Sequence, residues 1–302
     1  MEYRELGNTG LKISTICLGT MNFNNPVSET DSITMIHWAI DKGINFIDTA
    51  DVYEGYDRFL GSPGGKAEAI IGNALARRRS AVLITTKVGN HVADSSYDGK
   101  GLGTEHITRQ IEASLRRMKT DYVDIYELHF PDPNTPVEET ISVIDALIDA
   151  GKVRYWGFSN HTAEQINTIL TTCRKNSWPL PVISQPLYNW LLRDIEENDV
   201  PLCINNNISI TPYRPLEKGL LTGKYSQGQE PPASSRAAEN PAWLNLSDVS
   251  TDTFTLLKQF EEEAKTQSLS PANYAVKWLL DRPGVSSVII GGKTLEQLNQ
   301  FL

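Results

Sequence analysis

Cysteine is scarce in this sequence, and the few cysteines present exclude the usual cysteine chemistry. There are three, Cys17, Cys173 and Cys203, an odd number without the spacing of a metal or redox motif. We therefore expect reduced, mostly buried thiols, as in a cytoplasmic protein, and no metal site.

Long apolar runs and an excess of positive charge are missing as well. The longest apolar runs have the length of strands, so no transmembrane helix is predicted. Residues 1–4 are polar and contain no apolar signal-peptide core, which again indicates a cytoplasmic protein. The net charge of −9 disfavours nucleic acids and anionic membranes as partners. The oligomeric state is left open.

Two familiar phosphate-binding motifs are also absent. The segment from Gly61 to Lys66 is similar to a P-loop, but its glycine spacing is one residue short. Ala67 then stands where such a loop needs Ser or Thr, and no apolar strand leads in. No Gly-x-Gly-x-x-Gly follows the first apolar strand at residues 16–19, so a Rossmann dinucleotide site is unsupported.

The remaining pattern is a regular alternation of strands and helices. With 302 residues and 40% hydrophobic content, we expect one large domain over residues 1–302 rather than two small ones. Turn signals predict an N-terminal β-hairpin over residues 3–14. Apolar strands are then predicted at residues 16–19, 46–48, 82–87, 123–128, 153–158, 182–185, 208–211 and 287–290. An open doubly wound sheet fits this alternation, but eight repeats favour an α/β fold of the (β/α)8 TIM-barrel type.

Several boundaries are predicted from local signals. Residues 89–103 read as a polar loop, and residues 214–250 as loop-like because they are rich in Gly, Pro and Ser. Capping boxes are predicted at Thr135–Glu138, with Pro136 as the first helical residue, and at Thr162–Gln165 and Thr294–Gln297.

Ionisable side chains stand at the ends of three successive predicted strands. Asp48 ends the second strand, with Tyr53 five residues on; Lys87 ends the third, and His129 follows the fourth. Strand ends of a barrel share one face, so we expect these side chains to meet. The Lys87 ammonium would lower the pKa of Tyr53, and Asp48 would keep that ammonium charged. Singly, each could be structural: a rim tyrosine, an ion pair, a core histidine.

Polar residues also follow the later strands. Ser159, Asn160 and Gln185 fall at strand ends on the same predicted face. Tyr213, just past the seventh strand, could stack on a flat ring or merely pack against neighbouring prolines. The final predicted helix begins after Gly291, Gly292 and Lys293, a favourable place for a phosphate. Gln297 could contact such a ligand or could serve only in the capping box.

At these residues the sequence resembles the aldo-keto reductase family nearly from end to end. The resemblance is carried by Leu6–Leu11, Asp48–Tyr53, Thr86–Gly89, Leu128–His129, Gly151–Asn160 and Gln185–Asn189. It implies an NADPH-dependent carbonyl reductase on a (β/α)8 barrel, acting reversibly on a small aldehyde, ketone or sugar. Tyr53 would be the general acid, and Lys87 would adjust the pKa of Tyr53. Asp48 would be the partner of Lys87, and His129 would position the carbonyl.

The resemblance also implies where the cofactor lies. Ser159, Asn160 and Gln185 would hold the nicotinamide carboxamide, with Tyr213 against the ring. Gly291, Gly292, Lys293 and Gln297 would lie along the adenosine phosphates, and Lys293 offers a charge for the 2′-phosphate of NADPH. Gly19, Thr20, Arg214 and Leu216 complete the predicted cofactor contacts. The predicted substrate pocket, apolar and aromatic, consists of Phe23, Phe130 and Trp190.

Three positions depart from the family pattern. Arg214 stands where the family usually has serine, and Phe301 stands near the place of an adenine-binding asparagine. The sequence stops at Leu302, without the tail that often closes the substrate pocket.

Other functions fit the same residues. The protein could act as a sugar or alcohol dehydrogenase in the oxidative direction. The family also includes channel-associated members, so a cofactor-sensing regulatory subunit is a second alternative. A third keeps the barrel but uses Lys87 as a Schiff-base nucleophile, as an aldolase does.

Overall fold

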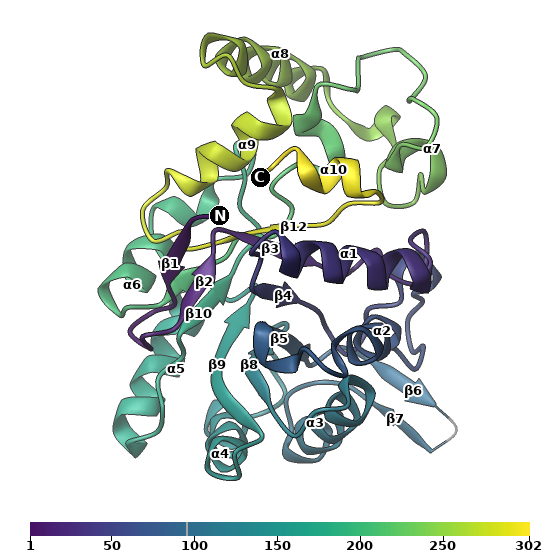
Figure 1. The fold of residues 1–302 in the computed structure, drawn as a ribbon. Coiled ribbons are helices and arrows are strands. Elements are labelled where there is room, and N and C mark those ends of the chain that lie inside the picture. The colour runs from purple at the N-terminus through teal and green to yellow at the C-terminus, as the bar shows by residue number, and fades with distance from the viewer. Residues whose placement is uncertain (95) are drawn as a thin grey trace.

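Eight parallel strands curl around a common axis, and helices cover them from outside (Figure 1). The computed structural model describes residues 1–94 and 96–302. The strands follow one another around the sheet in the order β11-β10-β9-β8-β5-β4-β3-β12. Their bounds are β3 (Ile16–Gly19), β4 (Phe46–Asp48), β5 (Leu83–Val88), β8 (Val123–Leu128), β9 (Val153–Ser159), β10 (Ile183–Gln185), β11 (Ser209–Ile210) and β12 (Val288–Ile290).

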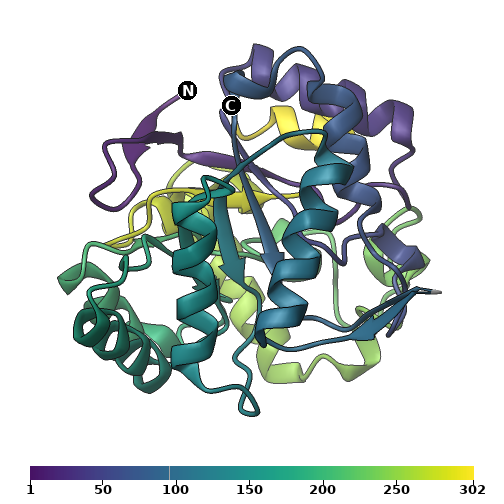
Figure 2. The same ribbon diagram turned by 90° about the horizontal axis from the view of Figure 1, so that it is seen from below.

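The two edges of this sheet are joined by backbone bonds. The amide of Ile210 donates to the carbonyl of Gly284 at 2.9 Å, and the amide of Ile289 donates to the carbonyl of Pro212 at 3.1 Å. A parallel bridge also pairs Ile210 with Val285. The view from below shows the strands at the centre and the helices around them (Figure 2). The fold is thus the predicted (β/α)8 barrel.

The outer helices begin where the sequence provides caps. Ser28 caps α1 (Glu29–Asp41) through its hydroxyl, and the predicted capping box of Thr162 and Gln165 is present before α5 (Ala163–Asn176). The others are α2 (Lys66–Leu75), α3 (Thr104–Met118), α4 (Val137–Asp149), α6 (Asp199–Asn205), α7 (Arg236–Glu239), α8 (Thr251–Thr266), α9 (Pro271–Leu280) and α10 (Leu295–Asn299). Within residues 1–94 and 96–302, no helix has the length and apolar character needed to span a bilayer.

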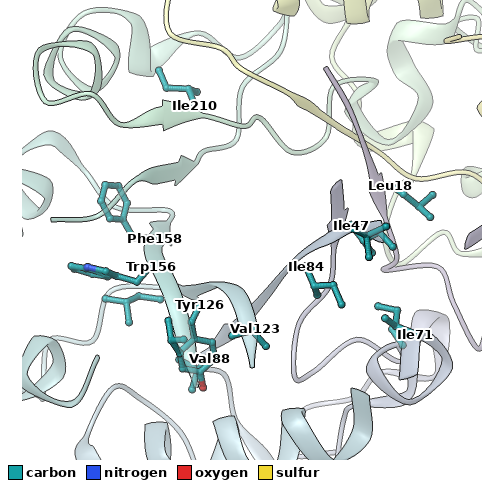
Figure 3. Packing of buried hydrophobic residues seen from close by; sticks show 14 of the residues in the cluster. Leu18, Ile47, Ile71, Ile84, Val88, Val123, Tyr126, Trp156, Phe158 and Ile210 are labelled. Carbon is teal, nitrogen blue, oxygen red and sulfur yellow. The ribbon is translucent and has the colours of Figure 1, made fainter. Parts of the chain in front are cut away.

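The hydrophobic core has two layers. The larger lies between strands and helices, where Leu18, Ile47 and Ile84 of three adjacent strands gather near Ile71 of α2 (Figure 3). The second fills the lower barrel with side chains from several strands and from the N-terminal hairpin, β1 (Tyr3–Glu5) and β2 (Lys12–Ser14). Its buried members are Leu6, Ile13, Cys17, Phe46, Ile125, Val182, Ile183 and Ile289. With the bottom filled, the carboxyl ends of the strands are left for a site.

Residues 89–103 are not the plain loop that the sequence predicts. They contain a second hairpin, in which β6 (Val92–Asp94) pairs antiparallel with β7 (Tyr97–Gly99). Val92 is buried against Ala50 and Val52 and holds the hairpin to the barrel. The prediction was wrong because one buried anchor in a polar stretch gives no readable alternation.

Two helix starts also differ from the prediction. Thr135 caps no helix, because its hydroxyl donates to the Asp132 carboxylate at 2.7 Å, and α4 begins at Val137 with Pro136 as its cap residue. Helix α6 was not predicted at all. It is seven residues long and has a proline in its first turn, so its apolar pattern is too short to read.

The long segment 214–250 is loop-like, as predicted, but it is not structureless. It carries a 3₁₀ helix (Glu217–Thr222), the short α7 and a further 3₁₀ turn (Leu246–Asp248). Leu220, Leu221 and Tyr225 pack with residues of α8 and α9 in a separate apolar cluster. This cluster fixes the segment beside the barrel.

A buried carboxyl without a partner lies in the loop after β4. Asp51 is 0% exposed, and neither of its carboxylate oxygens has a hydrogen-bond partner within the described part of the chain. Burial, then the neighbouring Glu68, raise the pKa of Asp51 well above its ordinary value, and Arg117 opposes them incompletely. The folded protein therefore favours the uncharged form of Asp51 more than water does.

This raised pKa makes stability depend on pH. The folded state binds a proton that the unfolded state releases above about pH 4, so stability falls with rising pH by at most about 1.4 kcal/mol per unit. Asp51→Asn removes this term. We expect the variant to gain in urea-unfolding free energy relative to the parent between pH 4.5 and pH 7.5. An equal difference between the two proteins at both pH values would contradict the prediction.

Candidate active site

The side chains of Asp48, Tyr53 and Lys87 meet at the carboxyl ends of β4 and β5. Lys87, 0% exposed, donates from Nζ to Asp48 Oδ1 at 2.6 Å and to the Thr49 carbonyl at 2.8 Å. Its third contact is Tyr53 Oη, at 3.3 Å. Lysine has three donors, and all three are used here, so the ammonium is fixed between a carboxylate and a phenol.

Burial changes the pKa values in this group. For Tyr53, burial raises the pKa above its ordinary value, and the attraction of Lys87 offsets only part of that rise. The predicted lowering was therefore wrong in sign, because it counted the ammonium and not the loss of water. For Lys87, burial lowers the pKa. Asp48, followed by Tyr53 and Glu127, raises it by more, so the pKa of Lys87 lies above its ordinary value. The group is thus a neutral phenol beside a charged ammonium.

His129 lies next to the phenol as a neutral ring. Its centroid is 6.1 Å from that of Tyr53, edge to face, and Phe130 stacks on it at 5.1 Å. Burial, followed by Lys87 and Arg58, lowers the pKa of His129 well below its ordinary value. The Asn90 amide nitrogen lies 2.8 Å from Nδ1 and can only donate there, so the proton of the neutral ring is on Nε2.

These residues border a cavity of about 610 Å³ at the top of the barrel. Five cationic side chains line it, whereas Asp48 is its one lining carboxylate among the described residues. The protein as a whole carries a net charge of −9, so this concentration of cations favours an anionic ligand. The cations are Arg214, Lys218, Lys224, Arg236 and Lys293.

Most of the predicted cofactor residues line this cavity. They are Gly19, Ser159, Asn160, Gln185, Tyr213, Arg214, Leu216, Gly291, Gly292, Lys293 and Gln297. Near the phenol, Gln185 Nε2 donates to Asp48 Oδ1 at 2.8 Å, and Tyr213 Oη donates to Asn160 Oδ1 at 2.8 Å. Gln185 Oε1 has no partner within residues 1–94 and 96–302, so it is available to a ligand amide.

The other end of the cavity carries polar groups suited to phosphates. Arg214 forms an ion pair with Glu217, yet its Nε is buried without a hydrogen-bond partner among the described residues. Buried donors are normally paired, so this N–H is available to an acceptor on a ligand. The predicted capping box at Thr294 is only half formed, because Gln297 accepts from the amide of Lys293 at 2.8 Å rather than from that of Thr294. These features fit a phosphate-bearing dinucleotide.

Three predicted residues lie away from the cavity. Phe23 is 1% exposed and packs in the core, and Met21 lines the cavity instead. Trp190 packs against Phe260 and donates from its indole nitrogen to Glu263 at 3.0 Å. These two are corrections to the predicted substrate pocket, since the sequence does not reveal which way a side chain turns in the loop after a strand.

The third is Thr20, which was predicted to contact the cofactor. Its buried hydroxyl donates to the Asp48 carbonyl at 2.9 Å, so it supports β4. Phe130, by contrast, does line the cavity and is 46% exposed at its mouth. Phe301, noted as a departure from the family pattern, lines it as well.

Arg236 and Trp243 are among the cavity-lining residues of the segment 214–250 that the sequence did not predict. The Arg236 guanidinium lies 5.3 Å from the ring centre of Trp243 and 6.0 Å from that of Tyr56, and it donates to Asn22 at 3.2 Å. The segment therefore reaches across the cavity to the loops that follow β3 and β4. An arginine and a tryptophan in a Gly- and Pro-rich stretch were the available signal.

The chain is similar to known proteins along nearly its whole length. Residues 15–302 match the model of the aldo/keto reductase family. A protein of Arabidopsis thaliana named a probable voltage-gated potassium channel subunit beta is 34% identical over 99% of this chain and 90% of its own length. The aldo-keto reductase YhdN of Bacillus subtilis (strain 168) is 33% identical, over 99% and 87%.

A solved structure is similar as well. The glycerol dehydrogenase of Gluconobacter oxydans superimposes with a TM-score of 0.80 at 26% identity, covering 99% of this chain and 88% of that one. The chain therefore belongs to the aldo/keto reductase family and is an NAD(P)H-dependent oxidoreductase acting on carbonyl or alcohol groups.

Proposed function

We propose that this protein is an NADPH-dependent carbonyl reductase, which reversibly converts a small aldehyde, ketone or sugar to an alcohol, with Tyr53 as general acid. One observation carries this proposal: Lys87 Nζ lies between Asp48 Oδ1 at 2.6 Å and Tyr53 Oη at 3.3 Å. A purely binding protein has no need of a phenol held against a buried ammonium. We also propose a cytoplasmic location and a small-molecule substrate.

In the proposed reaction, the side chains of the protein supply and control the proton that the carbonyl oxygen receives. The bound nicotinamide supplies the hydride for reduction. The neutral Tyr53 phenol donates its proton to the carbonyl oxygen, and the phenolate left behind lies beside the Lys87 ammonium, which stabilises it. His129 donates from Nε2 to the same oxygen and orients the carbonyl. Asp48 keeps the ammonium charged throughout.

The cofactor is proposed to lie along the cavity from Gln185 to Lys293. Gln185, with Ser159 and Asn160, holds the carboxamide, because the free Gln185 Oε1 can accept from its amide. Tyr213 packs against the ring. Arg214 and the cations beside it contact the phosphates, and Lys293 is the counter-charge for a 2′-phosphate. These assignments rest on the lining of the cavity and its positive charge.

The choice between NADPH and NADH is proposed to depend on a competing carboxylate. Lys293 Nζ donates to the Ser234 carbonyl at 2.6 Å and forms an ion pair with Glu239. A 2′-phosphate has to compete with Glu239 for this ammonium, and NADH has no such group.

Glu239→Gln is therefore expected to tighten NADPH binding about tenfold, or about 1.4 kcal/mol. NADH binding should stay the same, and Lys293→Met should make the two affinities equal. Cofactor fluorescence titrations measure both values. Lys224→Met, which removes another cation of the cavity, serves as the control and should change both affinities alike. A Glu239→Gln variant that tightens NADH as much as NADPH would refute this competition.

The names of similar proteins favour two alternative functions. A glycerol dehydrogenase shares the fold, so the oxidative direction on alcohols or sugars is a second candidate. The plant relatives bear the name of a channel subunit, so a cofactor-sensing regulatory role is another. The aldolase alternative is disfavoured, because a Schiff-base lysine needs a free amine, and Lys87 is buried, fully bonded and has a raised pKa.

A panel of carbonyl compounds assayed by loss of NADPH absorbance tests the proposal, with the reverse reaction on alcohols and sugars run in parallel. Reduction of at least one class supports it. Turnover confined to the oxidative direction favours a dehydrogenase. Tight NADPH binding without turnover on the whole panel would overturn it in favour of a regulatory role.

A further inference from the structure

A second carboxyl group lies inside the barrel below the site. Glu127 on β8 is 0% exposed and pairs in register with Lys87 of β5. Its Oε1 accepts from the Thr85 hydroxyl at 2.9 Å, while Oε2 is buried without a hydrogen-bond partner in the described part of the chain. A buried carboxyl this poorly supplied with donors is costly to ionise. The proposed hydride and proton transfer does not itself require such a residue.

Glu127 is joined to both halves of the proposed site by one side chain. Gln185 Nε2 donates to Asp48 Oδ1 at 2.8 Å and lies 3.4 Å from Glu127 Oε1. The two hydrogens of this amide thus face two carboxyl groups, which directs Gln185 Oε1 away from them. Asp48 continues the chain to Lys87 and Tyr53.

We propose that Glu127 is a positioning residue that couples cofactor holding to proton donation. Its Oε1 accepts from the amide of Gln185 and so helps to keep the amide oxygen of Gln185 free for the cofactor. Ionised, it adds a second negative charge beside Asp48, makes the Tyr53 phenolate harder to form, and so slows carbonyl reduction. This inference rests on the proposed function.

The groups that face Glu127 decide when it ionises. Lys87 of β5 and Asp48 of β4 are the charged ones, and the charge of Glu127 in turn acts on the neutral Cys17 of β3 and Tyr53 of the loop above. Burial raises the pKa of Glu127, Lys87 lowers it and Asp48 raises it again, to about 8. Its charge also raises the pKa of Tyr53. Reduction is therefore expected to fall as pH rises through about 8, because Glu127 is uncharged below that value and ionised above it.

The pH profile of kcat/KM for reduction tests the inference with Glu127→Gln, which keeps the shape of the side chain but cannot ionise. For the wild type we expect kcat/KM to fall about tenfold between pH 7 and pH 9. At pH 9 about nine tenths of Glu127 is ionised. Glu127→Gln should remain within about threefold over the same range. Superimposable alkaline limbs for the two proteins would overturn the proposal.

A second pair of variants decides the question even if Glu127→Gln does not fold. Thr85→Val removes the hydroxyl that supports the carboxylate, so it should move the alkaline limb of the profile upward in pH. Thr85→Ser keeps the hydroxyl and should leave the limb in place. A limb that moves equally in both variants, or in neither, contradicts the role of Glu127.

Failure of the proposed function has its own signature, namely a wild-type protein that reduces no carbonyl compound. In that case the dissociation constant of NADPH is measured against pH. Because ionised Glu127 adds a negative charge beside Gln185, which opposes an anionic cofactor, the inference predicts weaker NADPH binding by the wild type above pH 8 and a constant affinity for Glu127→Gln. Equal pH dependence in both proteins would refute it.

Discussion

Tyr53→Phe is expected to lower kcat for carbonyl reduction by roughly 10²–10⁴-fold, the usual contribution of a positioned general acid. The phenylalanine ring keeps the packing against His129 but has no proton to give. NADPH affinity should change little, since the lost hydroxyl contacts Lys87 and no phosphate-binding residue. Single-turnover rates and fluorescence titration measure the two quantities separately.

Tyr56→Phe is the matched control for this experiment. Tyr56 lies three residues further along the same loop, and its hydroxyl is buried without a hydrogen-bond partner among the described residues. Its removal should therefore leave turnover within about twofold, because no hydrogen bond is lost. A Tyr53→Phe enzyme that turns over as fast as this control would remove Tyr53 from the mechanism.

Lys87→Met is expected to have the second-largest effect, on stability as well as on turnover. It leaves the buried Asp48 carboxylate without its ammonium, and breaking a buried pair by removing one partner costs about 3–5 kcal/mol. Turnover should also fall, because no cation remains to stabilise the Tyr53 phenolate. Urea unfolding at pH 7 measures the first effect and kcat the second.

The double variant Lys87→Met with Asp48→Asn separates these two effects. Removing both charges abolishes the uncompensated carboxylate, so much of the lost stability should return while turnover stays low. A single Lys87→Met variant as stable as the parent would show that Asp48 does not need the ammonium. Turnover restored in the double variant would show that Lys87 acts only through stability.

The position of the proposed catalytic residues could be predicted from the sequence for a simple reason. Asp48, Lys87 and His129 stand at or just beyond the ends of apolar strands, and parallel strands place those ends on one face. Hydrophobic periodicity and helix caps located most strands and helices. They failed where a single buried residue anchors an element, as Val92 anchors the hairpin of β6 and β7.

Other features of the site depended on contacts between residues distant in the sequence. The pKa of Tyr53 is raised rather than lowered, because the burial that outweighs Lys87 comes from packing. Phe23 turns into the core, and Met21 takes its place at the cavity. Glu239 meets Lys293 from 54 residues away in the sequence.

The sequence by itself determined the barrel and the face that carries the proposed site, because period-2 and period-3.6 patterns and strand-end residues are local properties of the chain. Only the tertiary structure decided which donors each buried charge receives. It placed Glu127 under Gln185 and brought the segment 214–250 across the cavity. Burial and pairing arise between segments far apart in the chain, and no local pattern records them.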